Sequence, residues 1–247
     1  IRDSYMPLQW ISDVLAFVRK SGITVVSGLQ YVTSGHQAYN NVAIFAPVNT
    51  GRYTSSVLFA REKNDYAPME RQILALEKYI CVDQEKPVYQ MINNRGIDYG
   101  LFLCYEFTDI IARALYKDKV DIIFTPEHNR DTSYFSNIIE TTARDLHIFI
   151  VQANTSIYGD SRITGPFGRN DRNVLQIKGG DKDDIIIGTI ELGKVKKYQQ
   201  DEKVDFDNKI QEYLKYNRKQ KYEEEQKLFK EQKIKIAKTS ARFGGNK

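Results

Sequence analysis

The segment YGLFLCYEFTDIIARALYKDKVDIIFTP (residues 99–126) decides the fold. Residues 99–104 form a short apolar run that ends at a cysteine, residues 109–116 have the spacing of a helix, and residues 120–126 read as a strand that a proline stops. A strand, a helix and a second strand in succession are typical of the α/β class, in which helices cover a sheet.

The same alternation continues on both sides of this segment. Upstream, a helix that ends at Gly22 precedes three predicted strands, and a second helix begins at Pro68 and carries Ile80. The strands are expected at 23–29, 41–47 and 55–60, with an NTGR turn between the last two. Downstream, a helix over about 133–145 is followed by strands at 147–154, 161–164, 173–178 and 184–190. The order predicts an α/β protein rather than an all-β protein or a helical bundle.

Charge divides the chain into two parts. Residues 201–247 hold 13 Lys and Arg against 9 Asp and Glu, whereas the other 200 residues hold 23 of each sign, so the whole net charge of +4 lies in the tail. We therefore expect a domain over residues 1–197 and a long charged helical tail over 198–247. The tail is read as a solvated helix face, with a partner helix or a nucleic-acid backbone contact as the functional alternative.

Composition excludes several classes of protein. No apolar run approaches the ~18–20 residues that a bilayer requires, and IRDSYMPLQW is not a signal peptide, so no membrane contact is expected. The first residue is Ile rather than Met, and we read the chain as one shown from its middle. Two cysteines form no disulfide framework, which favours a reducing cytoplasm. Three histidines lack metal-ligand spacing, so we expect neither a metal nor a cofactor.

Cys104 is the first candidate for chemistry. It ends an apolar strand and precedes a helix, and such a turn offers backbone N–H groups that lower the pKa of a thiol and bind an oxyanion. The alternative is that Cys104 is simply packed in the core, as a cysteine at the end of a buried strand commonly is. Cys81 is read as a core residue at the end of a helix.

The segment REKNDYAPMER (61–71) places Lys63 and Glu70 between a strand and a helix. The plain alternatives are a solvated loop for Lys63 and a charge at a helix N-terminus for Glu70. Asp160 and Ser161 are read as hydrogen-bonding residues that order a loop. KGGDKDD (178–184) is read as a Gly-Gly turn between two strands rather than as a cation loop.

Taken together, these motifs resemble the nitrilase, or carbon–nitrogen hydrolase, superfamily over residues 8–195. The superfamily pattern K-N-x-x-x-P-x-E is met by Lys63, Asn64, Pro68 and Glu70, and C-Y-E is met by residues 104–106. Asn40–Asn41 before VAIF matches a Y-N-S-A strand. Further matches follow in order: TPEHNRD (125–131), ARD (143–145), QANTS (152–156), YGDSRI (158–163) and GPFG (165–168).

The resemblance implies a four-layer α-β-β-α sandwich and a set of roles. Cys104 is the nucleophile, Lys63 stabilises the oxyanion, and the N–H of Tyr105 is the second oxyanion donor. Glu70 matches a second glutamate that orients the lysine and the substrate. Glu127, His128 and Asn129 line the pocket by family position, although a generic turn also explains these three residues.

One part of the superfamily pattern has no match. Its general-base glutamate ends a strand that precedes the helix at residues 8–20, and IRDSYMP contains only Asp3 as a carboxylate. Either the glutamate lies in an upstream part that is not shown, or the domain has lost it. We expect the first, because the first strand of the sheet is missing as well. For this segment alone, hydrolase activity is therefore uncertain.

A narrower resemblance concerns the surroundings of the domain. NTSIYGDSRI (154–163) followed by KGGDKDDIIIG is similar to the nitrilase-like domain fused to bacterial defence-associated reverse transcriptases. Three hypotheses follow: a thiol hydrolase of amides or nitriles, a silent scaffold that assembles a reverse transcriptase into oligomers, and a nucleic-acid contact module that uses the tail. The resemblance implies a homo-oligomer in the cytoplasm, with nucleic acid bound by the attached polymerase rather than by this domain.

Overall fold

The computed structural model describes residues 8–49, 51, 54–168, 173–179 and 184–201, together with scattered helical residues between 208 and 227. The chain divides into two compact units, residues 1–196 and 197–247, and each is considered by itself. Among the described residues, every helix is too short or too polar to cross a bilayer.

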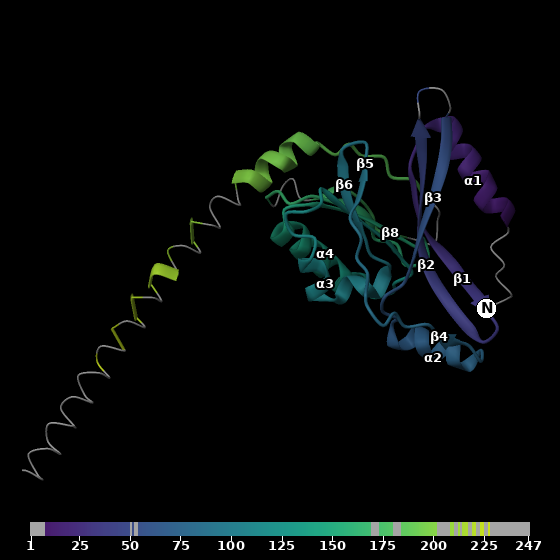
Figure 1. The fold of residues 1–247 in the computed structure, drawn as a ribbon, viewed down its shortest axis with the longest axis horizontal. Coiled ribbons are helices and arrows are strands. Elements are labelled where there is room, and N and C mark those ends of the chain that lie inside the picture. Colours follow the sequence, from purple (N-terminus) through teal and green to yellow (C-terminus); the bar gives the residue numbers. More distant parts are fainter. Residues whose placement is uncertain are drawn as a thin grey trace, which may run out of the picture. The chain divides into compact units, whose positions relative to one another are not determined.

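The first unit contains helices and strands in alternation (Figure 1). The labelled helices are α1 (Leu8–Ser21), α2 (Pro68–Leu76), the 3-10 helix η1 (Cys104–Thr108), α3 (Ile110–Ala114) and α4 (Thr132–Leu146), and residues 192–201 are helical as well. The longer strands are β1 (Val25–Ser34), β2 (Gln37–Asn49), β3 (Thr54–Glu62), β6 (Ile97–Leu101), β7 (Ile122–Glu127), β8 (Phe149–Asn154) and β10 (Asn173–Ile177). The shorter strands are β4 (Ile80–Cys81), β5 (Ile92–Asn94) and β9 (Ser161–Thr164).

These strands form two sheets. The first sheet has the order β1-β2-β3, with β4 pairing in parallel with β2. The second sheet has the order β10-β9-β8-β7-β6-β5, and its centre, β6-β7-β8, is parallel. The crossovers between these parallel strands run through η1 with α3 and through α4, as expected from residues 99–126.

The two sheets face one another, and helices cover their outer faces (Figure 1). Between the sheets lies an apolar cluster that includes Val42, Ile44, Leu101 and Phe149. Outside the first sheet, α1 packs its apolar stripe on β2, and outside the second sheet α3 and α4 cover the other face of β6, β7 and β8. The predicted four-layer α-β-β-α sandwich is therefore confirmed.

Two predictions about strands and helices were wrong. Residues 184–190 form no strand, and Ile185 and Ile187 are 83% and 86% exposed, so the apolar run has no buried face to fill. The second helix ends at Leu76 because Lys78 has a left-handed backbone (φ 63°), and Ile80 instead pairs in β4. The β2–β3 turn and most of KGGDKDD lie outside the described residues.

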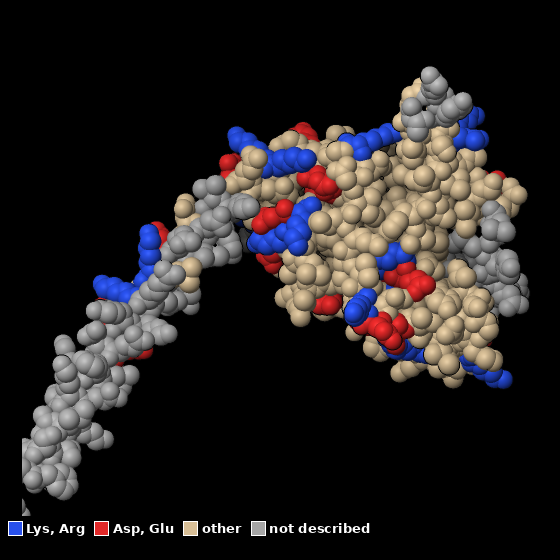
Figure 2. All heavy atoms as spheres, in the orientation of Figure 1, with Lys and Arg blue, Asp and Glu red and all other residues tan. Residues whose placement is uncertain are grey.

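Charges are mixed on the surface of this unit. On the visible face of residues 8–196, Figure 2 shows Lys and Arg side chains interspersed with Asp and Glu side chains. This agrees with the balance of 23 basic and 23 acidic residues outside the tail. On this face, the described residues do not form the continuous basic track that a nucleic-acid backbone requires.

Gly100 permits the close packing of β6 against the helical layer. A Cβ atom at this position would lie 2.6 Å from the ring of Tyr116, which is 1% exposed and donates a hydrogen bond to the Gln90 carbonyl. We therefore expect Gly100→Ala to lower the free energy of unfolding by about 1–3 kcal/mol, since an overpacked core must shift. Urea unfolding measures this. Gly193→Ala is the control, because no atom lies within 4 Å of its added Cβ, and equal loss in both variants would contradict the argument.

Candidate active site

Cys104 stands at the turn from β6 to η1. Its backbone is left-handed (φ 52°), a strained conformation for a residue with a side chain, and such strain is concentrated at functional sites. The side chain is half-buried. Desolvation raises the pKa of the thiol, while Lys63 and a hydrogen bond from the backbone N–H of His128 oppose this shift. The N–H of Tyr105 belongs to the first turn of η1, where amides have no partner within the helix.

Lys63 directly follows β3 and is buried. Its backbone N–H donates to the Asn40 carbonyl over 2.7 Å, its side chain is 2% exposed, and its Nζ lies 2.5 Å from Oε2 of Glu70. The alternative of a solvated loop is therefore wrong for Lys63. Lys63 comes from the first sheet and Cys104 from the second, and the structure brings the two within electrostatic reach of each other.

The carboxylate of Glu70 accepts four hydrogen bonds. Oε1 accepts from the Tyr31 hydroxyl and from Asn40 Nδ2, both at 2.7 Å, and Oε2 accepts from Lys63 and from the Ala67 N–H. Desolvation alone raises the pKa of Glu70, but the Lys63 charge and these hydrogen bonds outweigh it, and the pKa is lowered. Glu70 therefore holds Lys63 in place and has little capacity to take a proton.

Tyr31 is a partner that sequence reasoning missed. The β1–β2 register shifts between Leu29 and Val32, and this bulge contains Tyr31. Bulges re-aim side chains beside functional sites, and here the hydroxyl reaches Glu70. The alternating pattern of a strand gives no signal for such a shift, so only the structure reveals this contact.

A second buried ion pair joins the two sheets. Arg61 of β3 makes two parallel hydrogen bonds of 2.8 Å to Glu106 of η1, which is completely buried. Glu106 also accepts hydrogen bonds from the N–H groups of Leu103 and Asn64. Residues 104–106 were recognised as a motif, but the sequence assigned Glu106 no partner. The pair ties the chain next to Lys63 to the chain next to Cys104.

Glu127, His128 and Asn129, which were expected to line the pocket, have different surroundings in the structure. Glu127 is buried and accepts hydrogen bonds from Thr125 Oγ1 and Gln152 Nε2. Desolvation raises the pKa of Glu127 to about 7, although those two bonds oppose the shift. The ring of His128 packs edge-on against Tyr158, with 5.3 Å between ring centroids. Asn129 accepts from the N–H of Asp131 before α4, which fits the generic-turn alternative.

Asp160 and Ser161 order their loop, as expected. Asp160 accepts from Ser136 Oγ at 2.6 Å and pairs with the buried guanidinium of Arg162. The Ser161 hydroxyl bonds the backbone of Asn154. Within the described part of the chain, no group of three His, Cys, Asp or Glu side chains could hold a metal ion.

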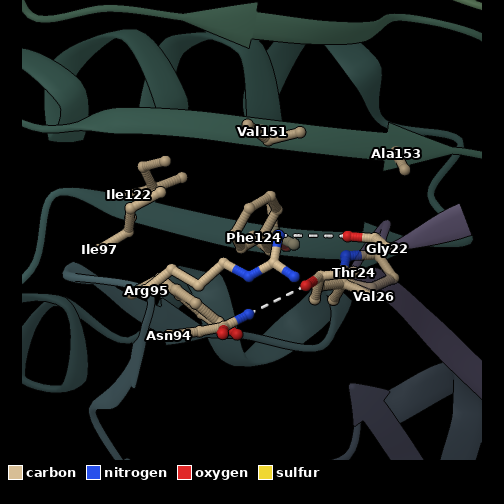
Figure 3. A pocket seen from close by; sticks show the side chains of 13 residues that line it. Gly22, Thr24, Val26, Asn94, Arg95, Ile97, Ile122, Phe124, Val151 and Ala153 are labelled. Carbon is tan, nitrogen blue, oxygen red and sulfur yellow. Dashed lines mark hydrogen bonds between the residues drawn. The ribbon is translucent and has the colours of Figure 1, made fainter. Parts of the chain in front are cut away.

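A cavity of about 380 Å³ lies between the sheets and away from Cys104, Lys63 and Glu70. Its walls are the start of β1 and the inner faces of β6, β7 and β8, with apolar side chains such as Phe124 and Val151 (Figure 3). At one side, Arg95 donates to the Gly22 carbonyl and Asn94 donates to Thr24 Oγ1. The cavity opens where β1, the end strand of the first sheet, has no neighbour among the described residues.

The sequence of this chain was compared with those of known proteins and families. The sequence profile described as carbon–nitrogen hydrolase matches residues 7–200. A search of curated protein sequences finds no match.

Solved structures share the fold. An amidase from Nesterenkonia sp. aligns with a TM-score of 0.52 and 19% identity over 68% of this chain and 62% of the amidase, so the chain spans less than two thirds of its length. A CN-hydrolase superfamily protein from Xanthomonas campestris, with an arsenic adduct in its active site, aligns with a TM-score of 0.59 and 10% identity over 77% and 71% of the two chains. A variant of the Nesterenkonia amidase shows covalent addition of the acetamide moiety of fluoroacetamide at the active-site cysteine, and aligns with a TM-score of 0.51 and 19% identity over 68% and 63%.

Breaking the Arg61–Glu106 pair should cost much of the stability of the domain. We expect Glu106→Gln to lower the free energy of unfolding by about 3–5 kcal/mol, because it leaves the buried Arg61 charge uncompensated. Urea unfolding measures the loss. Asp83→Asn is the control, since Asp83 pairs with Arg71 at the surface and should change stability by less than about 1 kcal/mol. Similar losses in both variants would contradict the structural role of Glu106.

Tyr31→Phe should destabilise the protein only where Glu70 is ionised. Removing a hydrogen bond to this carboxylate should cost about 1.5–3 kcal/mol at pH 7. Because the folded pKa of Glu70 is lowered, its contribution is present above the unfolded pKa and is lost as the pH falls through the folded pKa. The cost should therefore shrink below about pH 4.5. Urea unfolding at several pH values tests this, with Tyr39→Phe as the control, since the Tyr39 hydroxyl donates to a neutral partner, Gln37, in an exposed hydrogen bond. A cost that is independent of pH would exclude the role through Glu70.

Proposed function

Since the chain belongs to the carbon–nitrogen hydrolase family, we propose that residues 7–200 act as a thiol hydrolase on a non-peptide C–N bond, in an amide or a nitrile. One observation carries the proposal. Lys63, paired with Glu70, lies within electrostatic reach of Cys104, which stands at a strained strand-to-helix turn. A thiol beside a lysine and free amide N–H groups is suited to form an acyl-enzyme.

In the proposed reaction, the thiolate of Cys104 attacks the carbonyl carbon of an amide. The carbonyl oxygen becomes an oxyanion, which Lys63 Nζ and the N–H of Tyr105 stabilise. The C–N bond then breaks, the nitrogen keeps the electron pair and takes up the proton that the thiol lost, and the acyl group remains on sulfur as a thioester. Water attacks the thioester, releasing the acid and restoring the thiol.

We propose that a glutamate outside the described residues carries this proton. The hydrogen bonds of Glu70 and the ion pair of Glu106 occupy both of those carboxylates, and Asp3 lies outside the described residues. The cavity of about 380 Å³ supports a segment that docks beside β1, since it offers room at the end of the first sheet where the described residues leave β1 without a neighbour. The alternative is that the domain has lost its base.

We further propose that the domain is cytoplasmic and belongs to a defence-associated reverse transcriptase, as the similarity of NTSIYGDSRI suggests. The alternative function is a silent scaffold that makes the reverse transcriptase oligomeric. Exposed apolar side chains favour protein contacts for either function, because Met69, Ile73 and Leu76 lie on α2 and Ile110 and Ile111 on α3, each about half exposed or more. Nucleic acid would then be bound by the polymerase.

Covalent labelling with fluoroacetamide tests the hydrolase. We expect an acetamide group on Cys104 in the polypeptide that carries the proposed glutamate segment, and labelling slower by about 10²–10⁴-fold in residues 1–247 alone, because the base is absent. Lys63→Met should slow labelling about tenfold or more, since an opposite charge favours the thiolate. Mass spectrometry of peptides locates the group.

The two cysteines provide the internal control. Cys104→Ala should abolish the labelling, and Cys81→Ser should leave it unchanged. Equal labelling with and without the additional segment would show that no external glutamate activates the thiol. Strong labelling of Cys81 would mean that Cys104 is not the nucleophile, and the scaffold function would then be favoured.

A further inference from the structure

Glu127 and Cys104 lie at the same edge of the second sheet, because Glu127 ends β7 and Cys104 follows the end of β6, the parallel neighbour of β7. Leu101 of β6 pairs with Phe124 of β7, and the Phe102 N–H donates to the Phe124 carbonyl over 3.0 Å. β7 continues from Phe124 to Glu127, whereas the chain leaves β6 after Leu101 and enters η1 at Cys104. The backbone N–H of His128, the next residue, donates to the Cys104 sulfur. The thiol therefore lies against the end of β7.

Glu127 has no role in the proposed hydrolysis, but its side chain has hydrogen-bond partners of its own. Its side chain is buried, and Thr125 and Gln152 each donate to one of its oxygens. Oε1 of Gln152 is itself buried and has no hydrogen-bond partner among the described residues.

Few other charges reach Glu127. Arg162 of β9 acts to lower its pKa, but the same guanidinium pairs with Asp160 and lies 3.5 Å from Glu140 of α4. From η1, Cys104 is an ionisable group on which the charge of Glu127 acts. Around the thiol, the charge of Lys63 favours the thiolate, whereas Glu127 opposes it more strongly than Glu70 does.

We propose that Glu127 controls the ionisation of Cys104: the neutral acid allows the thiolate to form beside Lys63, and the carboxylate suppresses it. The charge of Glu127 acts on the Cys104 thiol electrostatically. Glu127 thus changes the ionisation of the nucleophile without contacting the substrate. The inference rests on the proposed function only in naming Cys104 as that nucleophile. Because burial places the pKa of Glu127 at about 7, the control operates near neutral pH.

Alkylation by iodoacetamide between pH 5.5 and 8.5 measures thiolate directly in the intact protein. We expect Glu127→Gln to label at Cys104 as fast as the unmodified protein at pH 5.5, where Glu127 is itself neutral. At pH 8 the variant should label about three- to tenfold faster, because removing the negative charge lowers the pKa of the thiol. Glu77→Gln removes an equal charge from an exposed site and should change nothing, and Cys81 serves as the reference within each molecule.

Each other outcome overturns the proposal. Faster labelling at every pH would indicate a loosened structure, and slower labelling would make Glu127 the acceptor of the thiol proton. If Glu127→Gln does not fold, the unmodified protein still provides the test, since its labelling rate should rise less than tenfold per pH unit between pH 6 and 8. A full tenfold rise throughout would exclude the control. The readout is independent of amide hydrolysis, so an inactive protein can still support the inference.

Discussion

The buried Arg61–Glu106 pair is the interaction on which the site depends. Apolar side chains hold the two sheets together, but apolar packing is not directional and leaves the sheets free to slide. The bidentate pair is directional, and the same carboxylate accepts hydrogen bonds from Asn64, the neighbour of Lys63, and from Leu103, the neighbour of Cys104. One side chain thereby fixes the positions of both reactive groups.

Three glutamates show how surroundings assign different roles to the same chemical group. Glu106 is paired with an arginine and acts as a structural link. Glu70 is surrounded by four donors, which lower its pKa and keep it ionised. Glu127 has neutral donors and a distant, shared arginine, so desolvation dominates and its pKa rises to about 7. The pKa of Glu127 thus moves in the opposite direction to that of Glu70.

The sequence predicted what depends on local pattern. Residues 99–126 gave the parallel strands and their crossover, and SRIT (161–164) coincides with β9. Contacts that depend on register could not be predicted, because Tyr31 reaches Glu70 only through a bulge and Arg61 reaches Glu106 across 45 residues. The expected strand at 184–190 failed for a related reason, since apolar alternation does not reveal whether a partner strand exists. The roles assigned to Cys104, Lys63 and Glu70 remain predictions.

The division of the site between two sheets has a consequence for the resting thiol. Glu127 ends β7 and Cys104 begins η1 just after the neighbouring strand β6, so both are attached to the same edge of the second sheet. Lys63 belongs to the other sheet, so its approach to Cys104 depends on how closely the sheets pack. Loosening the sandwich would therefore weaken the charge that favours the thiolate and preserve the charge that opposes it. The packing of the two sheets therefore determines how strongly Lys63 offsets the effect of Glu127 on the pKa of the Cys104 thiol.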